Sequence, residues 1–118
     1  MKISELCKKT GLSKDGVRHY EQLGLIQSLR KPAGSRYYQD YDDSALHRIE
    51  MIQCGKSCGF TLKEIKSIFD SADTDELSLA EIQPFLLEKL KELDLKVKEI
   101  EKMKAMIKQN LAGMDCQS

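Results

Sequence analysis

The chain has 118 residues, of which 32% are charged and 6% aromatic, and it has no Trp. This length fits one small domain, or a small domain with one long projecting helix, and the polar composition favours a second chain that completes the core. No apolar run reaches membrane-spanning length and the N-terminal segment has no signal-peptide core, so we expect a cytoplasmic protein, not a membrane protein, with reduced thiols at its four cysteines.

Charge is unevenly distributed along the chain, although the formal net charge is zero. Residues 1–38 hold eight Lys or Arg and three Asp or Glu, whereas the rest of the chain holds eleven and sixteen. A basic N-terminal part on an acidic body is typical of a module that binds a polyanion such as nucleic acid. Random surface variation is the alternative that charge alone leaves open.

The first 24 residues predict two short helices joined by a tight turn. Ser4 is expected to cap the first helix, which ends at Gly11, and Ser13 to cap the second, which stops at Gly24. Two helices of this length joined at a glycine are typical of a helix-turn-helix.

A pair of short strands is expected next, over residues 25–29 and 35–38, joined through the turn-forming segment Lys-Pro-Ala-Gly. Such a hairpin would form a wing beside the helix-turn-helix. A second helix pair then follows over residues 43–57 and 62–70, and Thr61 and Glu64 have the spacing of a capping box at the start of the latter. The polar residues 71–78 are interpreted as a linker.

A long helix with a heptad repeat is predicted over residues 79–111, followed by a short tail over residues 112–118. The first series of seam positions is apolar throughout and consists of Leu79, Leu86, Leu93, Ile100 and Ile107. The second series is mixed and consists of Gln83, Leu90, Val97, Lys104 and Leu111. At 1.5 Å per residue such a helix is roughly 50 Å long, too long to be buried against a small head. The pattern therefore predicts a coiled coil with a second copy of the chain.

Three segments in this order, ISELCKKTGLSKDGVRHYEQLGLI, GSRYY and GFTLKEIKSIF, resemble the MerR family of bacterial transcription regulators. The resemblance implies a mainly α fold, with a winged helix-turn-helix head over residues 1–70, which includes the second helix pair, and an antiparallel coiled-coil dimerisation helix over residues 79–111. It further implies a homodimer on a palindromic operator of double-stranded promoter DNA. The dimer would untwist and kink that DNA for RNA polymerase, so part of its specificity would be indirect readout.

The same resemblance implies DNA contacts from the second helix and from the wing. The matched positions are Lys14, Arg18 and Tyr20 on the helix, and Lys31, Arg36 and Tyr38 on the wing, with Arg30 on the same hairpin. Guanidinium, ammonium and phenol groups are suited to phosphate oxygens. For Tyr37, a position in the core and a position at the surface of the wing are both left open. Gly16 and Ser35 depart from the family's pattern, as does a longer stretch after the wing.

The effector is less defined by the sequence. Metal-sensing members hold their ion with a Cys or Ser at the start of the long helix and with cysteines beyond its end, but here these positions supply Leu79 and the single tail thiol of Cys116. We therefore expect no metal and no cofactor. Cys54 coincides with a cysteine of the members that respond to thiol and aldehyde stress, so Cys54, together with Cys116 in the tail, is assigned as a possible effector thiol. The alternative expectation is that Cys54, Cys58 and Cys7 are small buried core residues.

Other classes of protein make different demands on the sequence. An enzyme is not expected, because His19 and His47 have no plausible nucleophile beside them and no phosphate-loop or metal motif is present, so no catalytic residue is assigned. An architectural DNA-binding protein without effector and a pure coiled-coil adaptor remain as alternatives. Unlike the DNA-binding alternatives, the adaptor predicts no salt-dependent affinity for duplex DNA.

Overall fold

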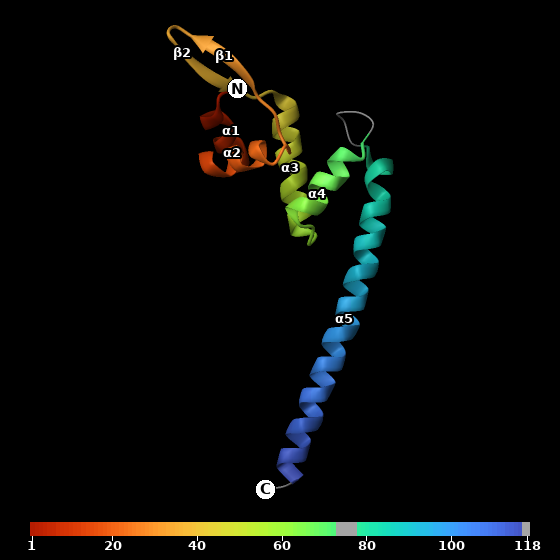
Figure 1. Cartoon of the computed structure of the whole chain (residues 1–118). Coiled ribbons are helices and arrows are strands. Elements are labelled where there is room, and N and C mark those ends of the chain that lie inside the picture. Colours follow the sequence, from red (N-terminus) through yellow and green to blue (C-terminus); the bar gives the residue numbers. More distant parts are fainter. Residues whose placement is uncertain (73–77, 117–118) are drawn as a thin grey trace. The chain divides into compact units, whose positions relative to one another are not determined.

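The computed structural model describes residues 1–72 and 78–116, with side chains up to Met114. The chain divides into two compact units, residues 1–77 and residues 78–118. The first unit holds four helices and a two-stranded sheet, and the second is one long helix (Figure 1). Most of the expected linker, residues 73–77, lies outside the described residues.

Two short helices open the chain, α1 over Ile3–Thr10 and α2 over Lys14–Gln22. Ser13 caps α2 as predicted, because its Oγ accepts a 3.0 Å hydrogen bond from the Gly16 amide. The predicted cap at Ser4 is wrong, since α1 already begins at Ile3 and its N-cap residue makes no side-chain cap bond. Gly11 ends α1 in the left-handed region, with φ of 77°.

The wing consists of β1, Leu29–Ala33, and β2, Arg36–Asp40, paired antiparallel with Ala33 opposite Arg36. Figure 1 shows this hairpin projecting from the helices of the head. The predicted first strand began four residues too early, because Leu25 and Ile26 are fully buried core residues and not part of the hairpin. A short apolar run has the same sequence pattern whether it forms a strand or a buried connection.

The second helix pair is α3, Asp43–Ser57, and α4, Leu62–Asp70. The capping box is confirmed, because Thr61 and Glu64 each accept a hydrogen bond from the other's amide. The two helices approach closely at Gly55, where an added Cβ would lie 3.1 Å from the Cδ1 of Ile65. A glycine there permits the contact.

The core of the first unit draws one apolar face from each helix and adds the connection after α2. Its most completely buried side chains are Leu6, Val17, Leu25, Ile26, Tyr41, Ile49 and Ile52. The expectation that Cys54 and Cys58 belong to this core is wrong, since both are exposed, whereas Cys7 is half-buried. Cys54 follows Ile52 by two residues, about 200° around the helix, and so lies on the other side of α3.

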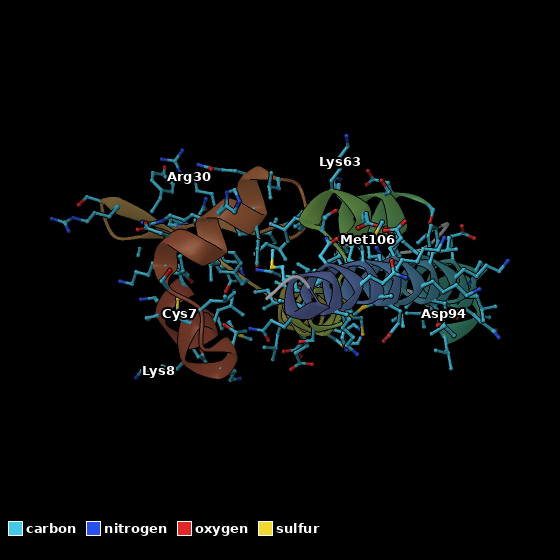
Figure 2. All side chains as sticks on the ribbon, turned by 90° about the horizontal axis from the view of Figure 1, so that it is seen from below. Cys7, Lys8, Arg30, Lys63, Asp94 and Met106 are labelled. Carbon is cyan, nitrogen blue, oxygen red and sulfur yellow. The ribbon has the colours of Figure 1, made fainter. Side chains whose placement is uncertain are left out.

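The second unit is α5, Leu79–Cys116, a helix of 38 residues. It extends past the predicted end at Leu111 and takes in most of the expected tail. Pro84 is the sixth residue of α5, just past the first turn, so its missing amide removes one hydrogen bond near the start of this helix. Figure 2 shows Asp94 and Met106 projecting from this helix. None of the described helices combines the length and apolarity that crossing a membrane requires.

Candidate nucleic-acid interface

All eight Lys and Arg residues of the first 38 residues have exposed side chains. They come from α1, α2, the wing and the N-terminal segment, and they are Lys2, Lys8, Lys9, Lys14, Arg18, Arg30, Lys31 and Arg36. The clustering of positive charge expected from the sequence is therefore a surface property of the folded head. Exposed cations on a helix and on an adjacent hairpin can neutralise phosphates along a duplex.

On α2 the predicted residues separate onto two faces. Lys14 and Arg18 are exposed one turn apart, and Arg18 forms a weak ion pair of 3.8 Å with Asp15. Tyr20, in contrast, is buried and only 5% exposed, so the structure places its ring in the core and not beside Arg18. The reason is helical geometry, because positions two apart point in nearly opposite directions.

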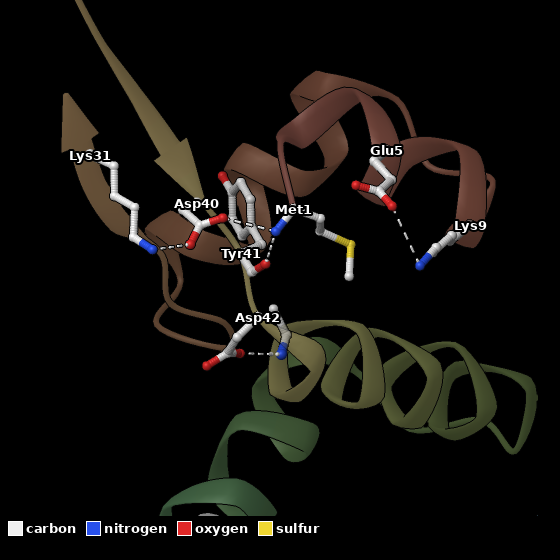
Figure 3. A network of polar contacts seen from close by, with 8 residues as sticks. Met1, Glu5, Lys9, Lys31, Asp40, Tyr41 and Asp42 are labelled. Carbon is white, nitrogen blue, oxygen red and sulfur yellow. Dashed lines mark hydrogen bonds and ion pairs between the residues drawn. The ribbon is translucent and has the colours of Figure 1, made fainter. Parts of the chain in front are cut away.

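At the base of the wing, Lys31 forms a 2.9 Å ion pair with Asp40, as Figure 3 shows. The other oxygen of the Asp40 carboxylate accepts a hydrogen bond of 2.8 Å from the amino group of Met1. These two cations lower the pKa of Asp40, the amino group having the larger effect, and Asp40 raises the pKa of Lys31. Lys31 is thus an exposed cation that also links β1 to β2 through its ion pair with Asp40.

The pleat of the wing sorts its side chains onto two faces. Residues that are paired across the strands share a face, so Lys31, Arg36 and Tyr38 lie together on one of them. Arg36 is exposed at the start of β2, next to the turn. Tyr38 is half-buried, and the ammonium of Lys2 lies 4.9 Å from the centre of its ring. The wing therefore presents three of the predicted residues together.

Arg30 and Tyr37 occupy the opposite face of the wing. The guanidinium of Arg30 lies 4.4 Å from the centre of the Tyr37 ring, and Tyr37 is 62% exposed, so this ring is not a core residue. Arg30 is labelled in Figure 2. A groove of about 650 Å³ between α2 and the wing is lined by both residues and by Arg18. The sequence leaves Tyr37 open between core and surface, because the strand register decides the face.

A hydrogen-bonded group connects α2 to the segment that follows the wing. Glu21 of α2 accepts hydrogen bonds from the phenol of Tyr41, at 2.8 Å, and from the hydroxyl of Ser28. Burial raises the pKa of Tyr41 to about 12, and the hydrogen bond to Glu21 and the charge of Glu21 add to the effect. The phenol therefore stays protonated and keeps α2 joined to the end of β2. Sequence reasoning did not single out either residue.

The possible effector residues have no metal site around them in the described part of the chain. The expected metal-sensing position at the start of α5 is Leu79, which carries no donor atom. Among the described side chains, no three His, Cys, Asp or Glu residues come together as metal ligands. The side chain of Cys116 lies outside the described residues. Leu79 therefore supplies no ligand at the position that the resemblance assigns to metal sensing.

Comparison with known proteins gives the same assignment over most of the chain. A family model described as "MerR HTH family regulatory protein" matches residues 1–72, and another described as "MerR, DNA binding" matches residues 46–109. The mercuric resistance operon regulatory protein of Bacillus cereus is 32% identical over 107 residues, which cover 90% of this chain and 79% of that protein. These relatives are transcription regulators and not enzymes.

Solved structures resemble the chain in fold. The transcription regulator PbrR691 from Ralstonia metallidurans CH34, in complex with lead(II), has a TM-score of 0.72 at 27% identity and matches 91% of this chain and 81% of its own. HiNmlR, a MerR family regulator lacking the sensor domain and bound to promoter DNA, has a TM-score of 0.55 at 21% identity, with 86% and 76% of the two chains matched. At that identity the second likeness shows the fold alone.

Proposed function

Since this chain belongs to the MerR family of DNA-binding transcription regulators, we propose that it binds a palindromic promoter operator as a homodimer and changes transcription by distorting the DNA. The observation that carries the proposal is the exposed cationic surface of the head, where Arg18 of α2 and Arg30 of the wing line one groove. In this arrangement α2 enters the major groove and the wing follows the phosphate backbone.

The five exposed or half-exposed residues among those predicted from the sequence have separate roles in this proposal. Lys14 and Arg18 reach base edges or phosphates from α2, and Lys31, Arg36 and Tyr38 bind the backbone from the wing. The buried ring of Tyr20 supports α2 from behind. Arg30 and Tyr37 are added on the strength of their exposure and of the groove they share with α2.

The homodimer is supported by the exposed seam of α5. Every apolar heptad position from Leu79 to Leu111 is exposed, with fractions between 39% and 76%. Burying such a stripe stabilises an assembly by about 25 cal/mol per Å² of apolar surface. An antiparallel pair of α5 helices covers the stripe, and a symmetric dimer matches a palindromic operator.

Transcriptional control would follow from deformation of the bound promoter. A dimer that untwists and kinks an overlong promoter spacer brings its two elements into the relation that RNA polymerase requires. Such a protein acts in the cytoplasm, where the promoter is. An effector that is sensed through the exposed thiol of Cys54 is one form of this proposal, and an architectural protein without effector is the other.

The test is a titration of duplex DNA with the full chain. Promoter fragments from around its own gene and its neighbours are scanned for a palindrome by footprinting. Affinity for the protected duplex is then measured between 50 and 200 mM salt, and about 0.9 of a unit of log–log slope is expected for each neutralised phosphate. Salt-independent affinity would refute DNA binding, and a one-chain, one-duplex complex would refute the homodimer.

A further inference from the structure

Two exposed thiols lie one helical turn apart at the end of α3. Cys54 and Cys58 are both free and exposed. Cys58 is the C-cap residue directly after α3, and its amide donates hydrogen bonds to the carbonyls of Cys54, at 3.2 Å, and of Gly55, at 3.1 Å. The bond to Cys54 is the contact between residues four apart in a helix, so the two side chains leave the same side of this last turn. The structure of the head gives neither thiol a role in the core.

The spacing of these thiols favours two bonds from the sulfurs to one shared atom over a direct disulfide bond. Residues four apart on a helix have Cβ atoms about 5–6 Å from each other. A disulfide needs about 3.5–4.5 Å between Cβ atoms, so an intact last turn of α3 holds the sulfurs too far apart to be joined directly. Two bonds of about 2.3 Å from sulfur to one soft ion bridge that gap with the side chains in ordinary rotamers.

We propose that Cys54 and Cys58 form a two-thiolate site for a thiophilic metalloid of the trivalent arsenic class. Soft thiolate ligands select soft centres, and an arsenic that carries one organic group needs two sulfur ligands. With an organoarsenic(III) oxide, two As–S bonds form, the As=O bond breaks, and the oxygen leaves as water with the two thiol protons. Arsenic keeps its oxidation state, so the step needs no oxidant or reductant.

The surroundings of the pair limit it to two protein ligands. Within the described residues no third Cys, His, Asp or Glu joins these thiols in a metal-binding group. Lys56 is two residues from each cysteine, about 200° around the helix, and leaves the approach to the pair open. This site differs in position from the family's metal site, whose expected residue at the start of α5 is Leu79.

The pair is placed where a bound ion could affect the packing of the head. Gly55, in the same turn as Cys54 and Cys58, lies close to Ile65 of α4, since an added Cβ would be 3.1 Å from the Cδ1 of Ile65. A chelate across this turn restrains the end of α3 at that contact. Its use as an effector site rests on the proposed DNA-binding function, whereas the binding itself does not.

The first measurement titrates the full chain, reduced and without DNA, with phenylarsine oxide. Intact mass spectrometry counts bound arsenic, and Ellman's reagent counts the free thiols that remain. We expect one arsenic per chain and the loss of two reactive thiols. Cys54→Ser and Cys58→Ser should each weaken binding about 100-fold, the usual gain from two linked contacts. Cys7→Ser and Cys116→Ser should bind as the parent does.

A matched variant tests whether arsenic binding depends on the position of the second thiol or only on the number of thiols. Cys58→Ser combined with Lys56→Cys keeps four cysteines but moves the second thiol to the far side of α3, and it should bind as weakly as Cys58→Ser alone. Circular dichroism checks that each variant is folded. Parent-like affinity in that double variant, or in either single Cys54 or Cys58 variant, overturns the proposal. Operator affinity is measured afterwards with and without phenylarsine oxide, so a failure of DNA binding leaves the result on the thiols intact.

Discussion

The carboxylate of Glu21 on α2 accepts a 2.8 Å hydrogen bond from the phenol of Tyr41, which is completely buried just beyond the wing. These two partners are 20 positions apart in the chain, and the whole hairpin lies between them. Glu21 is one turn away from Arg18, an exposed cation of the same helix. The bond therefore sets the position of the proposed DNA-reading helix relative to the wing.

Tyr41→Phe removes this bond and leaves the ring packing in place. We expect the free energy of unfolding to fall by about 1–2 kcal/mol, because a hydrogen bond to a charged acceptor is lost. Urea unfolding measures the loss. Tyr37→Phe is the matched control, since Tyr37 is exposed, and it should change stability by less than about 0.5 kcal/mol. Equal effects of the two variants would mean that the Glu21 contact contributes nothing.

The same residue should make stability depend on pH in the alkaline range. The pKa of Tyr41 is raised to about 12 in the folded chain, above its ordinary value of 10.0. The unfolded chain thus releases this proton first, so the contribution is fully present below pH 10 and is lost as pH rises toward 12. The urea midpoint of the parent chain should fall more steeply than that of Tyr41→Phe over this interval. Parallel curves would contradict the shift.

Arg18→Ala and Arg36→Ala test the two halves of the proposed interface. Each should weaken binding to the duplex and reduce the salt slope by about one unit if its guanidinium neutralises a phosphate. Fluorescence anisotropy at several salt concentrations measures both quantities. Lys102→Ala, which removes an exposed cation from α5, is the control and should leave the slope unchanged. An unchanged slope in both arginine variants would show that the docking is wrong.

The α5 seam can be tested with two leucines of the same helix. Leu93 lies on the heptad seam, whereas Leu95 lies two positions away, off the seam, and both are exposed in the single chain. Leu93→Glu should convert the dimer to a monomer because a charge would be buried at the interface, and Leu95→Glu should not. Sedimentation velocity gives the assembly state. A parent-like dimer in Leu93→Glu would rule out this seam.

Gly16→Ala should stabilise the head. A Cβ at Gly16 would meet the Oγ of Ser13 at 3.4 Å, which is an ordinary contact, so the gain in helix propensity of up to about 1 kcal/mol is expected to appear in urea unfolding. Gly11→Ala is the contrasting variant, because Gly11 has φ of 77° and a side chain there is strained by about 1–2 kcal/mol. A stabilised Gly11→Ala or a destabilised Gly16→Ala would contradict this account.

Much of the helical framework could be predicted, because the signals that start and end helices are local. Ser13, Thr61 and Glu64 cap helices through bonds to residues three positions away, and heptads repeat along one helix. The wing was placed less well. Leu25 and Ile26 were assigned to a strand, although the fold uses them as core, because burial of an apolar run depends on what surrounds it.

The sequence by itself determined the family, the order of the elements, and the cations at the surface of the head, since motifs, caps and charge are properties of short stretches. Only the tertiary structure decided which face each side chain takes. It placed Tyr20 in the core, brought Arg30 and Tyr37 to the groove beside Arg18, and left Cys54 and Cys58 in solvent. The reason is that burial and strand register depend on contacts between residues far apart in the chain, which no local pattern contains.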